Sequence, residues 1–214
     1  MIIMKEVWRL ILNPFVVAKY IYYKYISRHV IGKKARIIIN GRGLLNFSKN
    51  SILEVNGTLF LNQYRVSKSK AETIIQIEEN GKMVVDDSFS IWYGGNIKIF
   101  DNAVLHIGSG YCNINCLIRC KERICIGYGV YIAHNVTIMD SDFHEIGREG
   151  YIMTKPVVIE DHVWIGKGAT ILKGVTIGVG SIIAAESVVT HNVPAHSLVA
   201  GNPAKIINTD ISWK

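Results

Sequence analysis

The sequence predicts an all-β protein whose chain winds into a stack of short coils, and two regular features between residues 157 and 193 predict this fold. One large aliphatic residue recurs every six residues, at Ile159, Ile165, Ile171, Ile177, Ile183 and Val189. Small or medium-sized residues recur four places later in each unit, at Val163, Ala169, Val175, Ser181, Ser187 and Val193. Amphipathic helices need apolar residues every three or four positions and half-buried strands alternate, so neither explains this spacing. Each unit is expected to form one short strand and a tight corner, with the aliphatic residues stacked inside.

The run resembles the left-handed parallel β-helix of the hexapeptide-repeat acyltransferases, in which three such units make one triangular coil. The stretch "GNPAKII" at residues 201 to 207 is similar to the closing signature of that family. The resemblance implies a β-helix domain over residues 36–207, after an N-terminal segment of residues 1–35 and before a C-terminal tail of residues 208–214. Gly166, Gly178 and Ala184 follow three of the repeated aliphatic residues, and we expect them to relax the backbone near the corners.

Composition limits the classes of partner. A chain of 214 residues with a net charge of +7 is long enough for one domain with a small appendage, and its charge favours anionic partners. The 24 basic residues are scattered, and no aromatic-rich basic motif or zinc-finger spacing is present, so nucleic acid is not expected as a partner. A phosphorylated cofactor or an anionic membrane surface fits this charge equally well.

Four cysteines, Cys112, Cys116, Cys120 and Cys125, lie within a short stretch that also contains regularly placed isoleucines. Zinc sites usually show tight cysteine pairs with a distant second pair, which this spacing does not match. We therefore expect free thiols packed inside the coils of a cytoplasmic protein, and no metal.

Residues 1–31 differ from the remainder, since they are rich in aromatic and aliphatic residues and nearly free of glycine. Their longest uncharged stretch, Leu10 to Ala18, contains Pro14 and is far shorter than the roughly 20 residues that a membrane-spanning helix needs. No small-residue cleavage site follows, so a secretory signal is not expected. Two interpretations stay open: a helical segment that packs on the β-helix or on a neighbouring subunit, and a peripheral segment that lies on anionic lipid at the inner face of the plasma membrane.

The six-residue phase is blurred between residues 36 and 83, where Leu53, Leu59, Ile77 and Met83 keep fragments of it, and we expect irregular early coils there. The phase also breaks between Ile138 and Ile159, which are 21 residues apart. Because 21 is not a multiple of six, some residues of this interval must leave the coil, as a loop at about residues 139–156. Insertions in a solenoid often carry its binding function.

His144 is the candidate catalytic residue because it lies in this loop among polar side chains, in "DSDFHEIG". An imidazole with an ordinary pKa near 6.5 can accept and return a proton near neutral pH. The segment resembles galactoside and maltose acetyltransferases and polysaccharide acetyltransferases, in which a loop histidine before "VWIG" is the general base. The resemblance implies direct transfer of an acetyl group from acetyl-CoA to an acceptor hydroxyl, without an acyl-enzyme.

The same resemblance implies further site residues. "GYCNINC" resembles the family stretch whose asparagine contacts the acceptor, and Asn113 is the better match, with Asn115 as the alternative. Asp142 and Glu145 flank the base and could orient it or bind sugar hydroxyls. For acetyl-CoA, the implied residues are Trp164 at the acetyl end, the N–H of Lys167 as oxyanion donor, the backbone of Ala185 and Thr190 along the pantetheine, and Lys205 near the phosphates. His191 stands where the family usually has lysine.

The implied assembly is a homotrimer with active sites between subunits, and the favoured acceptor is a sugar of a bacterial capsule, O-antigen or exopolysaccharide. A streptogramin or chloramphenicol acetyltransferase is the alternative within the fold. Two alternatives come from other classes: a non-catalytic structural β-helix, and a γ-type carbonic anhydrase that would bind zinc through histidines such as His134 and His162.

Overall fold

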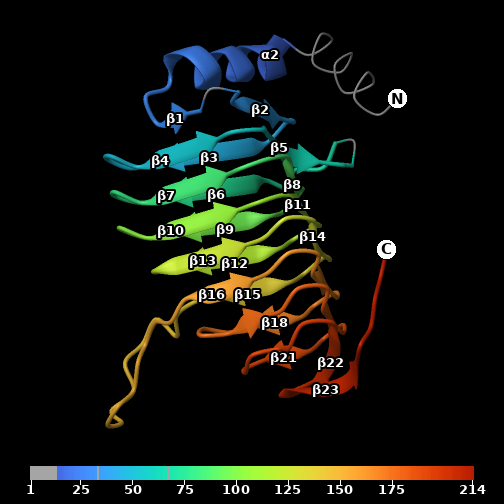
Figure 1. Ribbon diagram of the computed structural model, residues 1–214. Helices are drawn as coiled ribbons and strands as arrows, with labels where there is room; N and C mark the ends of the chain where they lie inside the picture. The colour runs from blue at the N-terminus through green and yellow to red at the C-terminus, as the bar shows by residue number, and fades with distance from the viewer. Residues whose placement is uncertain (1–13, 33, 67) are drawn as a thin grey trace.

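The computed structural model describes residues 14–32, 34–66 and 68–214, and these form a stack of coils in which the chain visits three β-sheets in turn (Figure 1). All strand pairs within the coils are parallel, as a β-helix requires. The described chain thus confirms the expected all-β solenoid.

Each sheet takes one strand from every full coil, and the second sheet continues with two further strands. The first sheet consists of β1 (Val30–Ile31), β4 (Ile52–Val55), β7 (Lys82–Val85), β10 (Val104–Ile107), β13 (Arg123–Ile126), β16 (Val157–Ile159) and β19 (Thr176–Ile177). The second consists of β2 (Arg36–Ile39), β5 (Thr58–Gln63), β8 (Phe89–Trp92), β11 (Gly110–Cys112), β14 (Val130–Ile132), β17 (Trp164–Ile165), β20 (Ile182–Ile183), β22 (Ser197–Gly201) and β23 (Ala204–Thr209). The third consists of β3 (Gly43–Phe47), β6 (Thr73–Ile77), β9 (Asn96–Ile99), β12 (Leu117–Cys120), β15 (Thr137–Met139), β18 (Thr170–Ile171) and β21 (Val188–Val189).

The repeated aliphatic residues form the interior ladder that the spacing predicts. Ile159 pairs with Ile177, Ile165 with Ile183, and Ile171 with Val189, and the structure buries all six. The residues four places later are buried as well, from Val163 to Val193. Because the interior ladder extends through all coils, one continuous hydrophobic core runs along the axis.

The early coils are as well packed as the late ones, and the blurred phase has a simple cause. Ladder partners lie 18 residues apart at Ile159 and Ile177, but 19 apart at Ile107 and Ile126 and 22 apart at Val85 and Ile107. Extra residues at the corners shift the sequence period while the strands remain in register.

Glycines at two corners are required for a different reason from the one expected. A Cβ atom on Gly166 would lie 2.7 Å from the backbone nitrogen of Ala185, and one on Gly178 would lie 2.4 Å from that of Ala195. Neither glycine has a positive φ. The next coil approaches these corners so closely that no side chain fits.

The N-terminal part is helical over its described residues, with α2 (Pro14–Ile21) followed by a π-helical turn η1 (Tyr22–Ile26). Figure 1 shows α2 across the end of the stack, where Val16 is buried and Tyr23 packs against the core. Residues 1–13 of the expected segment lie outside the described residues. The sheet begins at β1, before the expected boundary at residue 36, because Val30 and Ile31 pair with β4. Among the described residues, no helix has the length and apolar character that crossing a membrane requires.

The C-terminal end departs from the solenoid pattern. Strand β23 runs antiparallel to β22 and extends to Thr209, beyond the expected boundary at residue 207. The backbone N–H of Ile211 then donates to the His196 carbonyl at 2.9 Å. The remaining residues return along the nine-stranded sheet, where Trp213 contacts the side chains of β14 and β17.

Candidate active site

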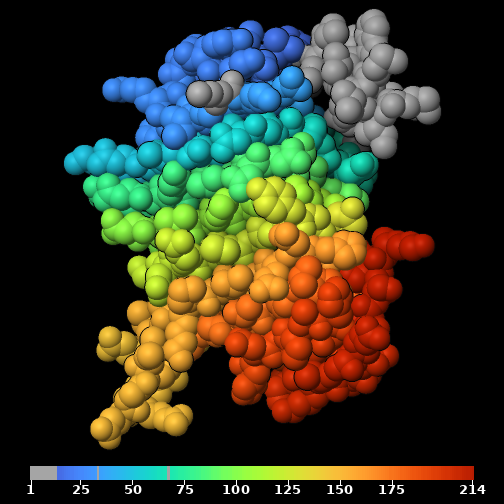
Figure 2. Space-filling model, viewed as in Figure 1, coloured from blue at the N-terminus to red at the C-terminus, as the bar shows by residue number. Residues whose placement is uncertain are grey.

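The loop that carries His144 leaves the stack between β15 and β16, and Figure 2 shows it as an arm that stands clear of the body. Asp140, at the start of this loop, anchors it to the stack. This fully buried carboxylate accepts hydrogen bonds from the backbone N–H groups of Lys121 at 2.7 Å and of Glu122 and Arg123 at 2.8 Å. Hydrogen bonds to a charged acceptor are among the stronger ones in proteins. Asp140 thus fixes the start of the loop to the preceding coil.

The outgoing and returning segments of the arm are held together just beyond this anchor. Ser141 and Thr154 form an antiparallel bridge, in which the Thr154 hydroxyl donates to Ser141 Oγ at 2.8 Å. The Asp142 N–H donates to the Met153 carbonyl at 3.0 Å, and the Phe143 N–H donates to Ser141 Oγ at 3.1 Å. These bonds restrain the backbone on either side of His144.

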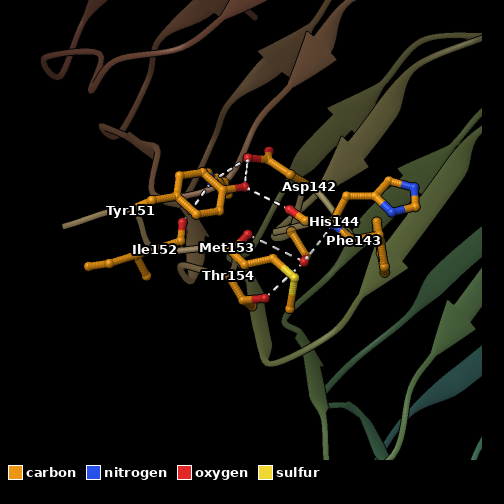
Figure 3. A network of polar contacts seen from close by, with 9 residues as sticks. Asp142, Phe143, His144, Tyr151, Ile152, Met153 and Thr154 are labelled. Atoms are coloured by element: carbon orange, nitrogen blue, oxygen red, sulfur yellow. Dashed lines mark hydrogen bonds and ion pairs between the residues drawn. The ribbon is translucent and has the colours of Figure 1, made fainter. Parts of the chain in front are cut away.

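Asp142 lies at the centre of a polar network (Figure 3). Its Oδ2 accepts hydrogen bonds from Lys173 Nζ and, at 2.5 Å, from the Tyr151 hydroxyl, which also lies 3.0 Å from the His144 carbonyl oxygen. Lys173 donates in addition to the Ile152 carbonyl at 2.7 Å, and its ammonium lies 4.3 Å from the centre of the Tyr151 ring. Because Lys173 belongs to the following coil, it braces the arm against the stack.

The Lys173 ammonium and the Tyr151 hydroxyl lower the pKa of Asp142 below its ordinary value, while the Asp142 carboxylate raises the pKa of Tyr151. The carboxylate is therefore held ionised, with Oδ2 occupied by protein groups and Oδ1 without a partner among the described residues. The contacts of Oδ2 support the orienting role expected for Asp142, and Oδ1 stays open to an acceptor hydroxyl.

The His144 imidazole points away from this network in Figure 3. Its side chain is exposed and has no hydrogen-bond partner in the described part of the chain. Glu145 is also exposed and has no hydrogen bond or ion pair to the described residues of the network. The loop thus fixes the backbone of His144 while leaving both ring nitrogens open to a substrate.

The residues implied for acetyl-CoA lie on other parts of the stack. Trp164 begins β17, Lys167 follows that strand, and Ala185 follows the next strand of the same sheet, β20. The Glu186 N–H donates to the Lys167 carbonyl at 2.8 Å, so these two corners are stacked one coil apart. The backbone N–H groups of Lys167 and Ala185 have no hydrogen-bond partner within the described ranges.

Asn113 follows β11 of the second sheet, at the same edge as Lys167 and Ala185. It is half-buried, and its Oδ1 accepts a hydrogen bond from the Ile114 N–H at 2.7 Å, which leaves the side-chain NH₂ group without a partner among described residues. Asn115 has a positive φ of 58° and is exposed at the turn.

Three further residues implied for acetyl-CoA lie near the C-terminal end of the stack. Thr190 and His191 follow β21 and contact each other, with Thr190 Oγ1 2.8 Å from His191 Nδ1. Lys205 is exposed in β23, where it pairs with Ala200. The loop with His144 connects the third sheet to the first, whereas Lys167 and Ala185 lie between the second and the third. One chain therefore presents the two groups at different corners.

The tail contributes an aromatic contact that the sequence pattern did not indicate. The Trp213 ring stacks on His162 with centroids 4.0 Å apart, meets the Tyr131 ring edge-on at 5.4 Å, and lies 6.1 Å from Trp164. His162 Nε2 is also 3.0 Å from the Trp213 carbonyl oxygen. His162, which the carbonic anhydrase alternative would use for zinc, is thus engaged by the tail.

The cysteines follow the expected burial with one exception. Cys112, Cys116 and Cys120 lie in the core, but Cys125 is half-buried because its strand position faces outward. Burial and the nearby Asp140 raise the pKa of the Cys120 thiol. Within residues 14–32, 34–66 and 68–214, no group of three or more His, Cys, Asp or Glu side chains is arranged to hold a metal ion.

A cleft of about 360 Å³ lies at a different corner, between the first and second sheets. Asp86, His106, Tyr128 and Asp161 line it, and Asp86 accepts hydrogen bonds from His106 Nε2 at 2.7 Å and from the Tyr128 hydroxyl at 3.1 Å. None of the implied site residues lines this cleft. The implied chemistry lies on open corners of the stack instead.

Comparison with known proteins gives the family. Residues 156–191 match the family model "Bacterial transferase hexapeptide (six repeats)". A Schizosaccharomyces pombe protein named provisionally as an acetyltransferase is 33% identical over 148 residues, which are 65% of this chain and 67% of that protein. The chain belongs to the hexapeptide-repeat acetyltransferase family.

Two other relatives match this chain over a smaller share of their own length. The galactoside O-acetyltransferase of Escherichia coli is 38% identical over 119 residues, which are 54% of this chain and 55% of that enzyme. A Saccharomyces cerevisiae protein, also named provisionally as an acetyltransferase, is 41% identical over 58% of this chain and 61% of its own length. The match thus spans less than two thirds of these two relatives.

Solved structures share the fold. The polysialic acid O-acetyltransferase OatWY superposes with a TM-score of 0.57 at 23% identity, over 86% of this chain and 90% of that one. The polysialic acid-specific acetyltransferase NeuO superposes with a TM-score of 0.55 at 23% identity, over 88% and 90%. The family model begins at residue 156, after the loop, so it contains the repeats but not His144.

Proposed function

We propose that the protein transfers an acetyl group from acetyl-CoA to a hydroxyl of a sugar. The observation that carries the proposal is the braced arm, which holds the backbone of His144 through Asp142 and Tyr151 and leaves its imidazole exposed. Membership of the hexapeptide-repeat acetyltransferase family supports the reaction, and the named galactoside O-acetyltransferase supports a sugar as acceptor.

In the proposed reaction His144 takes the proton of the acceptor hydroxyl as its oxygen attacks the thioester carbonyl of acetyl-CoA. The tetrahedral intermediate collapses, the carbon–sulfur bond breaks, and the imidazolium returns the proton to the CoA thiolate. The free N–H of Lys167 is suited to the oxyanion, because a rigid backbone donor needs no reorganisation during the reaction. The buried cysteines take no part.

The corners that we assign to the cofactor supply unpaired backbone groups and positive charge. Acetyl-CoA would lie along the second sheet, with the acetyl end beside the exposed Trp164 and the pantetheine at the free N–H of Ala185. Thr190 and His191 would contact its far part, and Lys205 its phosphates. Because Lys167 and His144 occupy different corners of one chain, we propose that a neighbouring subunit completes each site in a homotrimer.

The favoured acceptor is a sugar unit of a bacterial surface polysaccharide, contacted by the free side-chain NH₂ of Asn113. An exposed arm that meets an open corner of the neighbouring subunit would suit a hydroxyl on a large, solvent-accessible molecule. We place the reaction on the cytoplasmic side, where acetyl-CoA is made.

Release of CoA thiol from acetyl-CoA by the wild-type protein and by His144→Ala tests the proposal. Simple glycosides, bacterial oligosaccharides and a streptogramin serve as acceptors. Loss of a general base should lower turnover by at least about 100-fold, whereas Glu149→Ala, a control at an exposed position of the same loop, should change it only slightly. Full activity of His144→Ala would exclude the base, and absence of acetyl-CoA binding would leave a non-catalytic β-helix as the better account.

A further inference from the structure

The outer face of α2 and η1 exposes an unusual number of large apolar side chains. Ile21, Tyr22, Tyr25 and Ile26 are 46%, 49%, 70% and 64% exposed. Residues three and four apart share one face of a helix, so these four residues form a single patch, which we call the terminal patch. Exposed apolar groups that cluster in this way mark interaction sites more often than isolated ones do.

The opposite face of the same segment holds it on the β-helix. Lys19 Nζ donates to the carbonyls of Gly41 at 3.1 Å and Gly43 at 3.2 Å, and the Tyr23 ring packs edge-on against Phe47 at 6.3 Å. Burial lowers the pKa of Lys19. The segment is therefore seated by its inner face, and the terminal patch is not the face that anchors it.

Along the sequence that contains the terminal patch, charge has one sign. The sequence contains no Asp or Glu between Glu6 and Glu54, and nine of its 24 basic residues lie in that interval. Arg28, Lys34 and Arg36 are exposed and have no ion-pair partner among the described residues. Lys24 lies beside the patch, with Nζ 3.0 Å from the Tyr20 hydroxyl and 5.2 Å from the Tyr25 ring centre.

We infer that this end of the molecule docks on a bilayer surface rich in anionic lipid. Exposed tyrosine and isoleucine side chains next to arginine and lysine match the interfacial region, where aromatic rings enter the headgroup layer and cations meet phosphates. A second copy of the chain is a poorer occupant, because two such ends would bring like charges together. Since α2 crosses the end of the stack (Figure 1), docking would leave the arm and the corners free.

Sedimentation with lipid vesicles tests the inference on the full chain. The protein should bind vesicles of phosphatidylcholine with phosphatidylserine and bind vesicles of phosphatidylcholine alone much more weakly. Arg28→Gln with Lys34→Gln should weaken binding about 25-fold at low salt, at roughly fivefold per basic residue, and added salt should reduce the difference. Tyr25→Ser with Ile26→Ser should weaken binding at least about tenfold.

A matched control is available on another part of the surface. Tyr64 and Val66 are 64% and 60% exposed, so Tyr64→Ser with Val66→Ser removes a similar pair of side chains and should leave vesicle binding unchanged. His144→Ala should also bind like the wild type, because docking does not depend on acetyl transfer. Failure of the transferase proposal would therefore leave this result intact.

Three outcomes would overturn the inference. The first is equal binding to neutral and anionic vesicles, or to neither. The second is a large drop in the thermal unfolding midpoint of Tyr25→Ser with Ile26→Ser, which would mean that another part of the chain covers the patch. The third is a change of oligomer size in these variants without a change in lipid binding, which would assign the patch to a protein interface.

Discussion

Replacement of Asp140 by Asn should destabilise the base of the arm strongly, although the two side chains have the same shape. Asp140 is fully buried and accepts three backbone N–H groups, one through Oδ1 and two through Oδ2. If the amide oxygen takes the place of Oδ2, loss of the charge weakens two bonds by about 1 kcal/mol each. The amide NH₂ then faces the Lys121 N–H, and an unsatisfied buried donor costs about 1–3 kcal/mol. The expected loss is about 3–5 kcal/mol.

Urea unfolding measures this loss, and amide hydrogen exchange localises it to Lys121, Glu122 and Arg123, which should exchange faster in the variant. Glu122→Gln is the control, because this neighbouring carboxylate is exposed and its loss should change the free energy of unfolding by no more than about 0.5 kcal/mol. A loss below about 1 kcal/mol in Asp140→Asn, with exchange of the three amides unchanged, would refute the anchoring role.

Other parts of the loop and stack give further predictions. Lys173→Met removes the brace from Asp142, so kcat should fall about tenfold while the KM for acetyl-CoA stays the same, and Lys173→Arg should restore part of the rate; equal changes in kcat and KM would contradict a positioning role. Because its pKa lies below the ordinary 3.8, the ionised Asp142 orders the loop above pH 3.8, and this order is lost as the pH falls through the lowered pKa. An NMR titration of the carboxyl carbon should show this pKa rising toward 3.8 in Lys173→Met, and an unchanged titration would exclude the coupling. Gly166→Ala would place a Cβ 2.7 Å from backbone atoms of the next coil and should cost about 1–3 kcal/mol, whereas Gly147→Ala, with no atom within 4 Å, should cost little; equal unfolding midpoints would refute the close approach.

The late coils and the arm could be predicted from sequence because the six-residue period marks the coils and its interruption marks the arm. One aliphatic residue per six fixes which side chains point inward, and this predicted the ladder from Ile159 to Val189. The interval between Ile138 and Ile159 breaks that phase, and the structure has the loop there. In the early coils, corner insertions shift the spacing of ladder partners, so the same signal weakens although the packing does not.

The brace and the anchor could not be predicted because their partners are distant in sequence and belong to no repeat. Lys173 reaches Asp142 across 31 residues, and Asp140 reaches Arg123 across 17. In "MDSDFHEIG" the buried Asp140 and the exposed Asp142 look alike, and only the three-dimensional contacts separate the anchor from the network. Trp213 meets His162 across 51 residues, and the tail that carries it has no periodicity.

A parallel β-helix provides some catalytic groups easily and others only through an insertion. Interior positions are mostly apolar and the strands pair their own backbone groups, so free N–H donors arise at corners, as at Lys167 and Ala185. Those N–H donors are rigid, but they are stacked one coil apart along a single corner and therefore point to the same side of the molecule. In the proposed reaction the general base has to approach from elsewhere, and an extruded arm would meet this need if its backbone is fixed to the stack. The contacts of Lys173, Tyr151 and Asp140 fix it in that way. In the proposed reaction, changes at the Ala185 corner should therefore act mainly on acetyl-CoA affinity, and changes at the Lys167 corner or at the brace mainly on turnover.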